Sequence, residues 1–362
     1  MSENREYISV FRGERLKISV FGASHASKIG VTAEGFNKGE TFDKEKLGRF
    51  LKRRAPSKNA FSTTRIEPDE VIFKDGEENG VLTGDTLVAI IENKAQRSAD
   101  YGEELRIPRP GHADYVGYAK FGKEYDFRGG GIFSGRMTAP LCIAGGIAKQ
   151  ILDKKGIKIC AFIESVGKAD CKTYNDIDVC NFDFSAVKEE FPLLDDNDRE
   201  KAETEIKEAR EDGDSVGGRI GCVIKGVPVG TGNTMFGSLE SELSMLLFGV
   251  PAVKGVEFGK GFEITKMRGS KANDPFVTDG KKITTKTNNN GGINGGIANG
   301  MPITFSVAIK PTPSIFKEQE SVDLKKMENV KFTIKGRHDA CIAVRAVPVI
   351  EAVAAIAILD NL

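Results

Sequence analysis

Apolar and polar positions along the 362-residue chain predict five helices and four strands. The helical segments combine helical spacing of apolar residues with caps or terminal glycines, and they span 43–54, 138–155, 198–211, 238–248 and 348–360. The last begins at Pro348 and is almost wholly apolar, so we expect it to be buried. The strand segments are rich in β-branched residues between turn signals, and they span 86–92, 157–166, 219–225 and 302–309.

Helices and strands alternate without a regular βαβ repeat, and no strand–GxGxxG–helix unit occurs. A Rossmann domain is therefore not expected. The pattern predicts an α/β (α+β) fold, a sandwich in which helices pack against mixed or antiparallel sheets. No repeat of fixed period and no low-complexity linker interrupts the chain, so we expect a single domain over residues 1–362.

Composition narrows the class of protein. Hydrophobic residues make up 40% of the chain, and 52 Lys and Arg balance 52 Asp and Glu. This balance predicts no general attraction to nucleic acid or membrane. The N-terminus has no apolar segment of the signal-peptide kind, and no run approaches 18 apolar residues, which predicts a cytoplasmic protein. None of the six cysteines has metal-ligand spacing, so no metal centre is expected.

The chain has only three histidines, His25, His112 and His338, and all lie in segments that predict exposed, glycine-containing turns. Histidine changes charge nearest to neutral pH. Asp114 follows His112 closely and Asp339 follows His338, and a nearby carboxylate can orient an imidazole. Any one histidine can have a purely structural role. Three such groups together indicate proton transfer on an anionic substrate.

Two glycine-rich segments are candidate anion sites. Residues 128–136 lead into the helix at 138 and carry Arg128 and Arg136, so backbone, helix N-terminus and arginines would meet a phosphate together. Residues 287–300 hold five glycines and five asparagines. They form either a mobile loop or a backbone wall for a planar or phosphorylated ligand. The lysine and hydroxyls of 310–314 would also suit a phosphate.

Arg53 and Arg54 end the first predicted helix. Cations at this end favour the helix dipole, so a structural and a functional interpretation of the pair are equally open.

These segments, taken in order, resemble the chorismate synthase family from about residue 10 to 361. The matching motifs are FGASHA, RPGHADY, RGGG, DSVGG, AVKGVE, TNN, KPTPS and GRHD. The resemblance implies a single-domain β-α-β sandwich, a homotetramer, and the 1,4-anti elimination of phosphate from 5-enolpyruvylshikimate 3-phosphate. Such an enzyme is a carbon-oxygen lyase of the shikimate pathway, and it requires reduced FMN (FMNH2) without net redox change.

The resemblance also implies residue roles. His25 would protonate the departing phosphate, His112 would donate a proton near the flavin pyrimidine ring, and Asp339 would help remove the flavin N5 proton. Arg54 and Arg136 would meet the substrate. The residues expected to hold FMN are Ser134, Ala252, Gly295, Lys310, Pro311, Thr312, Pro313, Ser314 and Arg337.

The chain departs from the family pattern at several of these places. The departures are Ala23, Ala26, Ala55, Ala60, Ile132, Phe133 and Met137. They leave two alternatives open: a flavin-dependent relative that acts on another allylic phosphate, and a non-catalytic FMN-binding protein. No pyridine-nucleotide fingerprint is visible, so we expect an external flavin reductase rather than reduction of the flavin by NADPH on this chain.

Overall fold

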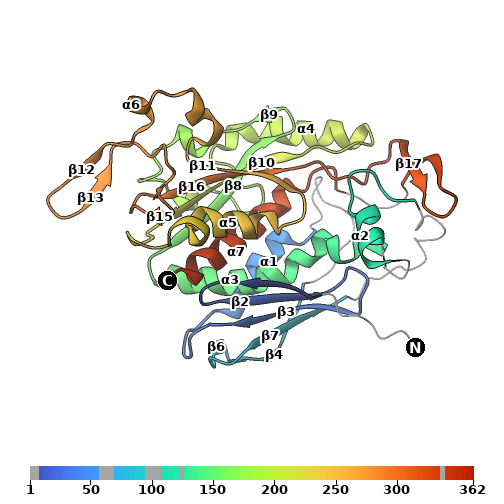
Figure 1. Ribbon diagram of the computed structural model, residues 1–362, viewed down its shortest axis with the longest axis horizontal. Coiled ribbons are helices and arrows are strands. Elements are labelled where there is room, and N and C mark those ends of the chain that lie inside the picture. Colours follow the sequence, from blue (N-terminus) through green and yellow to red (C-terminus); the bar gives the residue numbers. More distant parts are fainter. Residues whose placement is uncertain (1–7, 57–68, 94–106, 123–125, 127, 335–338) are drawn as a thin grey trace.

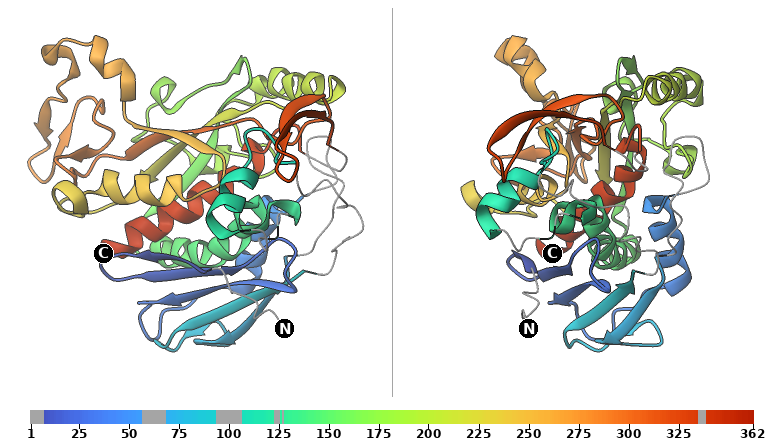
Figure 2. Two further views of the ribbon diagram at one scale, coloured as in Figure 1. Left: turned by 45° about the vertical axis from the view of Figure 1, so that its right-hand side comes forward. Right: turned by 90° about the vertical axis from the view of Figure 1, so that its right-hand side faces the viewer.

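The computed structural model describes residues 8–56, 69–93, 107–122, 126, 128–334 and 339–362. It has a layer of helices between two five-stranded sheets (Figure 1). The two further views show the same layers from the side, with α3 and α7 between the sheets (Figure 2). The predicted sandwich of helices and antiparallel sheets is therefore confirmed.

The first sheet is fully antiparallel. In spatial order its strands are β1 (Ile8–Arg12), β2 (Lys17–Gly22), β3 (Lys28–Glu34), β7 (Leu87–Glu92) and β4 (Val71–Asp75). Alternate residues of β3, Ile29, Val31 and Ala33, are fully buried, as expected where one face of a sheet packs on a core. The loop between β2 and β3 carries His25.

The second sheet is also antiparallel. Its strands are β11 (Val253–Phe258), β16 (Ile303–Ile309), β10 (Gly218–Lys225), β8 (Lys158–Val166) and β9 (Ala169–Asp170). One hydrophobic core joins Ile220 of this sheet to Ile29 of the first. A smaller cluster around Phe162 and Tyr174 covers the outer face. The end of β16 leads directly into Lys310.

Four helices fill the space between the sheets: α1 (Lys44–Arg54), α3 (Thr138–Lys154), α5 (Leu239–Phe248) and α7 (Ala343–Asp360). Asp43 caps α1 through the backbone N–H groups of Glu45 and Lys46. Helices α3 and α7 pack so closely that a Cβ on Gly145 would lie 2.4 Å from that of Ala352. A fifth helix, α4 (Arg199–Glu211), lies outside β8 and β9.

The remaining elements are short. They are α2 (Asp114–Phe121), α6 (Gly269–Ala272), and the strand pairs β5 (Glu77–Glu78)/β6 (Val81–Leu82), β12 (Phe276–Thr278)/β13 (Ile283–Thr285), β14 (Ile293–Asn294)/β15 (Ile297–Ala298) and β17 (Gln319–Asp323)/β18 (Glu328–Phe332). None of the helices in the described part of the chain combines the length and the apolar character that a membrane span requires.

The predicted start of the last helix at Pro348 is wrong, because α7 begins at Ala343 and contains that proline. Proline normally marks a first turn because it lacks an N–H. Here the apolar sequence continues on both sides of Pro348, and burial of α7 against α3 and β8 outweighs one lost backbone bond. The earlier start places Arg345 in the first turn of α7.

Candidate active site

A turn of three glycines lies between the side chains of His25 and His112 and contacts both. Gly129, Gly130 and Gly131 have φ of +59°, +88° and +55°, a region that side chains disfavour. A Cβ on Gly129 would lie 2.4 Å from Cε1 of His25, and one on Gly130 would lie 3.1 Å from Nε2 of His112. The turn therefore brings together two imidazoles that are far apart in the sequence.

The loop that carries His25 is fixed from two sides. The Ser24 N–H donates to the carbonyl of Gly131 (3.1 Å), and Nδ2 of Asn93 donates to the carbonyl of Ala26 (2.8 Å). His25 itself is 9% exposed. The predicted turn is present, but the prediction that this histidine is exposed is wrong, because the glycine turn covers its ring.

His112 lies in the turn before α2 and contacts a carboxylate. Its Nδ1 is 2.6 Å from Oδ1 of Asp114, and Asp114 also accepts from Nε (2.7 Å), Nη2 (2.8 Å) and the backbone N–H (3.0 Å) of Arg109. Burial raises the pKa of Asp114, but Arg109 and His112 outweigh burial and hold that pKa well below its ordinary value. The expected carboxylate beside His112 is thus present, whereas His338 lies outside the described residues.

The segment that follows β16 contacts the His112 turn at two points. Lys310 Nζ donates to the carbonyl of Gly111, and Nη1 of Arg109 donates to Oγ of Ser314 (3.1 Å). Burial, together with the charge of Lys254, lowers the pKa of Lys310. The Lys310 N–H donates to the carbonyl of Ala252 (2.9 Å), so Ala252 also belongs to this region.

Thr312 stands at the centre of this segment between two prolines. Its carbonyl accepts from Oγ of Ser215 (2.7 Å). Its own Oγ1 is buried and has no hydrogen-bond partner within the described part of the chain. Pro311 lies against Gly217, and Pro313 lies against Gly111. A buried hydroxyl without a partner, beside a lysine, suits a polar or anionic ligand.

Gly295 lies apart from this segment. It is in the turn between β14 and β15, and the preceding Gly292 packs on the carbonyl of Pro302, just before β16. Lys310 follows the other end of β16, and a seven-residue strand spans about 20 Å. The structure therefore does not bring Gly295 to residues 310–314.

Residues 287–300 have a defined conformation, of which the β14–β15 hairpin is part. Asp274 organises the start of the segment: its carboxylate accepts from Oγ1 of Thr287 (2.6 Å) and from the N–H groups of Asn289 (2.7 Å) and Asn290 (2.9 Å). These bonds offset part of the entropy cost of ordering so many glycines.

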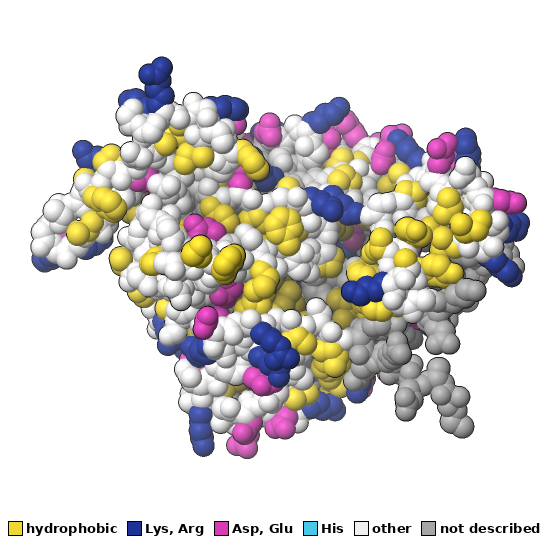
Figure 3. Space-filling model, in the orientation of Figure 1, with side chains coloured by type: hydrophobic (Ala, Val, Ile, Leu, Met, Phe, Trp, Pro, Cys, Tyr) yellow, Lys and Arg dark blue, Asp and Glu magenta, His cyan; other side chains and the backbone are white. Residues whose placement is uncertain are grey.

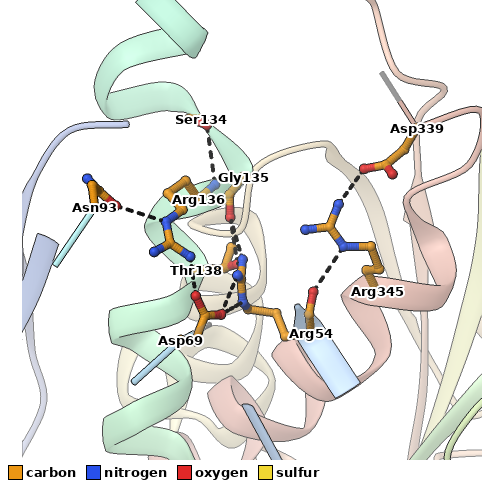
Figure 4. Close-up of polar contacts among 9 residues, drawn as sticks. All are labelled: Arg54, Asp69, Asn93, Ser134, Gly135, Arg136, Thr138, Asp339 and Arg345. Carbon is orange, nitrogen blue, oxygen red and sulfur yellow. Dashed lines mark hydrogen bonds and ion pairs between the residues drawn. The ribbon is translucent and has the colours of Figure 1, made fainter. Parts of the chain in front are cut away.

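The two arginines expected to bind substrate meet at Asp69 (Figure 4). Arg54 donates from Nη2 (2.6 Å) and Nε (3.2 Å) to Oδ2 of Asp69, and Arg136 pairs with Oδ1. Arg136 Nε also donates to Oδ1 of Asn93 (3.2 Å). Asp69 is 2% exposed at its side chain. Burial raises its pKa, but the two arginines outweigh burial and lower that pKa.

Asp339 joins this group through Arg345. The guanidinium of Arg345 pairs with Asp339, and its Nε donates to the carbonyl of Arg54 (2.9 Å) (Figure 4). Arg345 takes this position because α7 begins before it. Arg337 lies outside the described residues.

Ser134 stands between the glycine turn and Arg136. Its N–H donates to the carbonyl of Gly131 (3.4 Å), and its Oγ accepts from the N–H of Arg136 (3.3 Å). Its neighbours at two of the departures are apolar: the ring of Phe133 lies 6.4 Å from that of Phe121 on α2, and Met137 packs against the core. Neither side chain adds a charge to the site.

Sequence reasoning missed Asp69 and Asn93. Asn93 directly follows β7, and polar residues after strands often carry function, so its position was an available signal. For Asp69 no signal was available in the sequence except that the residue is charged. Within the ranges that the structure describes, no group of three His, Cys, Asp or Glu side chains could hold a metal ion.

Comparison with known proteins identifies the family. The family model described as chorismate synthase matches residues 16–362. A chorismate synthase from Thermococcus gammatolerans is 41% identical over 352 residues, with 97% of each chain covered. One from Lancefieldella parvula is 43% identical over 363 residues, with 97% of this chain and 95% of the relative covered.

Structural comparison agrees with the sequence comparison. A crystal structure of a chorismate synthase matches with a TM-score of 0.74 at 25% identity, and the match covers 97% of this chain and 92% of that one. The chain therefore belongs to the chorismate synthase family, which is a family of lyases.

Proposed function

We propose that this chain converts 5-enolpyruvylshikimate 3-phosphate to chorismate and phosphate by 1,4-anti elimination, with reduced FMN as its cofactor. The observation that carries the proposal is the glycine turn 129–131, which separates His25 from His112. Arg136 follows this turn, and Lys310 reaches the turn that holds His112. Cationic, proton-carrying and backbone groups thus surround one region.

The residues around 310–314 fit a phosphorylated, planar cofactor. Lys310, Ser314 and Oγ1 of Thr312, which has no partner among the described residues, form a polar segment beside Ala252. Bound reduced FMN would supply an electron-rich ring and a basic N5 atom without net oxidation of the substrate. We assign Ser134, Pro311, Pro313 and Arg337 to the same group by family resemblance. Gly295 is left out of this assignment, because it lies at the other end of β16 from Lys310.

The side chains would divide the work on the substrate. Arg54 and Arg136 would bind its anionic groups in competition with Asp69, since a guanidinium forms strong hydrogen bonds to carboxylates and phosphates alike. His25 would give a proton to the departing phosphate. His112 would hold a proton at the cofactor, and Asp339 would take one up. General acid–base groups of this kind contribute about 10²–10⁴ in rate.

Exposed apolar side chains support the proposal of a homotetramer. Met245 and Phe248 on α5, Tyr115 on α2, and Phe276 and Ile283 on β12–β13 are all more than half exposed. Apolar side chains gather over these elements in Figure 3. Such patches mark interaction surfaces.

The continuous core between the sheets supports a single domain. We also propose a cytoplasmic location and an external flavin reductase.

Anaerobic incubation with chemically reduced FMN and 5-enolpyruvylshikimate 3-phosphate tests the function. We expect chorismate, followed by its absorbance, together with one phosphate for each chorismate. Phosphate without chorismate would indicate another allylic phosphate chemistry, and FMN binding without either product would indicate a non-catalytic flavoprotein.

Calorimetry on Lys310→Ala should show FMN binding weakened by about 1.5–3 kcal/mol, the range for a charged hydrogen bond.

A further inference from the structure

We propose that Asp114 is the positioning residue for His112: it fixes the proton of the imidazole on Nδ1 and turns Nε2 toward the glycine turn. The inference deepens the proposed function, and only its kinetic test rests on that function. It concerns which ring nitrogen of His112 is left to exchange a proton.

The contact between the two side chains determines the direction of the hydrogen bond. Oδ1 of Asp114 lies 2.6 Å from Nδ1 of His112. Three N–H groups of Arg109 also point at this carboxylate and keep it ionised. An ionised carboxylate only accepts. Nδ1 must therefore donate, whether the ring is neutral or charged.

Arg109 could also donate a hydrogen bond to Nδ1 of His112, but the distances do not favour this bond. Its Nη2 lies 3.1 Å from Nδ1 of His112 and 3.4 Å from Nε2. A guanidinium has donors only, so Nδ1 could accept from it only if Asp114 gave up its own bond to the ring. Nη2 lies closer to Asp114 Oδ1, at 2.8 Å, and donates there.

The carboxylate cannot easily turn away from the ring. Asp114 is 6% exposed, and it is held by one arginine from three donors at 2.7–3.0 Å. The same arginine donates to Ser314, so the carboxylate that orients His112 is tied to the segment that we assign to FMN. This arrangement couples the ring orientation to the cofactor segment.

The opposite edge of the ring faces the glycine turn. A Cβ on Gly130 would lie 3.1 Å from both Nε2 and Cε1 of His112. With Nδ1 committed to Asp114, Nε2 is the nitrogen that can exchange a proton on the side of the turn. Which nitrogen is protonated is set by the bond that the other one makes.

A second role for Asp114 would be purely structural, since an acidic residue in the first turn of α2 stabilises the helix through its dipole. That role predicts lower stability in Asp114 variants, with no change in the proton position of His112. The two roles therefore differ in measurable ways.

The proton position can be measured without substrate or cofactor. With only three histidines in the chain, protein labelled with ¹⁵N-histidine gives three pairs of ring signals, which His25→Ala and His338→Ala assign by elimination. At a pH where the ring is neutral, we expect a protonated Nδ1 on His112, and a shift toward protonated Nε2 in Asp114→Ala. A protonated Nε2 in the unmodified chain, or unchanged signals in the folded variant, would overturn the proposal.

Turnover tests the consequence. Asp114→Asn keeps the shape of the side chain but weakens the acceptor, and we expect turnover to fall about tenfold or more. In a His112→Ala background the same substitution should change turnover by less than about twofold. An equal loss in both backgrounds would overturn the proposal, because a structural role acts in either one.

The matched control is Glu203→Gln, which removes an ion pair with Arg199 on the surface of α4 and should leave turnover unchanged. If the unmodified chain forms no chorismate, the proposed function fails, while the ¹⁵N signals still decide whether Asp114 positions His112.

Discussion

Adjacent arginines at the end of α1 serve two different buried carboxylates. Arg53 binds Glu351 from Nη1 (2.8 Å) and Nη2 (3.1 Å), and Glu351 also accepts from Lys149 (2.5 Å) and from the N–H of Ala161 (3.1 Å). Arg54 binds Asp69, which it shares with Arg136. Among the described residues, the partners of Glu351 lie on α1, α3 and β8, whereas Asp69 lies just before β4 and Arg136 just before α3.

The difference separates stability from function within two consecutive residues. The Glu351 group joins α7 to three other regular elements, and its donors are directed into a buried carboxylate. In the Asp69 group, the contacts that Nη1 of Arg54 makes within the described residues are long, at 3.5 Å from Gly135 and Thr138, and the glycine turn is close. We infer that the first group holds the helix layer together and that the second is available to a ligand.

The largest expected effect is on stability. Glu351→Leu leaves Arg53 and Lys149 buried without their carboxylate, and breaking such a group costs about 3–5 kcal/mol. We expect this loss in denaturant unfolding, with turnover per folded molecule reduced by less than about threefold. Glu351→Gln serves if the leucine variant does not fold. A loss of turnover without a loss of stability would contradict the division between the two groups.

Acid should act through the same carboxylate. Burial raises the pKa of Glu351, but Lys149 and Arg53 outweigh burial and lower that pKa to about 2. A depressed pKa contributes stability that is fully present above the ordinary value of 4.5 and is lost as the pH falls toward 2. The advantage of the unmodified chain over Glu351→Gln should therefore shrink by up to about 1.4 kcal/mol per pH unit in this window. A constant difference would exclude this linkage.

Arg53 and Arg54 should differ in their effect on substrate binding. Arg54→Met should weaken substrate binding by about 1.5–3 kcal/mol, the range for hydrogen bonds to a charged group, and so raise KM. Arg53→Met is the matched control on the neighbouring residue: it should lower stability and leave KM within about twofold. Equal KM effects in both variants would remove the distinction.

The same contrast explains how far the sequence determines the structure. Segments with a strong apolar period, such as 138–155 and 219–225, fold within a residue or two of their predicted limits. β1 to β3 were not predicted, although three apolar residues in each of ISVFR, KISVFG and KIGVTAE gave an available signal for short, half-buried strands. α2 escaped because a short helix beside a functional motif has a weak pattern.

The site was predictable where one motif holds both partners and obscure where distant loops meet. His112 and Asp114 are neighbours in sequence, so their contact was foreseeable. Asp69, just before β4, and Arg136, just before α3, are far apart in the sequence and meet only through tertiary packing, which no local pattern encodes. The position of Gly295, at the far end of β16 from Lys310, likewise depends on strand pairing.

The smallest effect is expected at Asn93, at the edge of the Asp69 group. Asn93 links Arg136 to the loop that carries His25, through an acceptor on one side and a donor on the other. Asn93→Ala loses both bonds, and we expect turnover about tenfold lower, since each neutral or charged hydrogen bond contributes about 1 kcal/mol or more. Asn93→Asp keeps an acceptor for Arg136 but loses the donor to Ala26, so it isolates the loop contact.

An equal loss of turnover in Asn93→Ala and Asn93→Asp would show that fixing the His25 loop is what matters. Near-native turnover in Asn93→Asp would show that the Arg136 contact is what matters. Asn37→Ala, which removes an exposed bond to Glu40, is the control and should leave turnover unchanged. Native turnover in both Asn93 variants would mean that the Asp69 group and the His25 loop work independently.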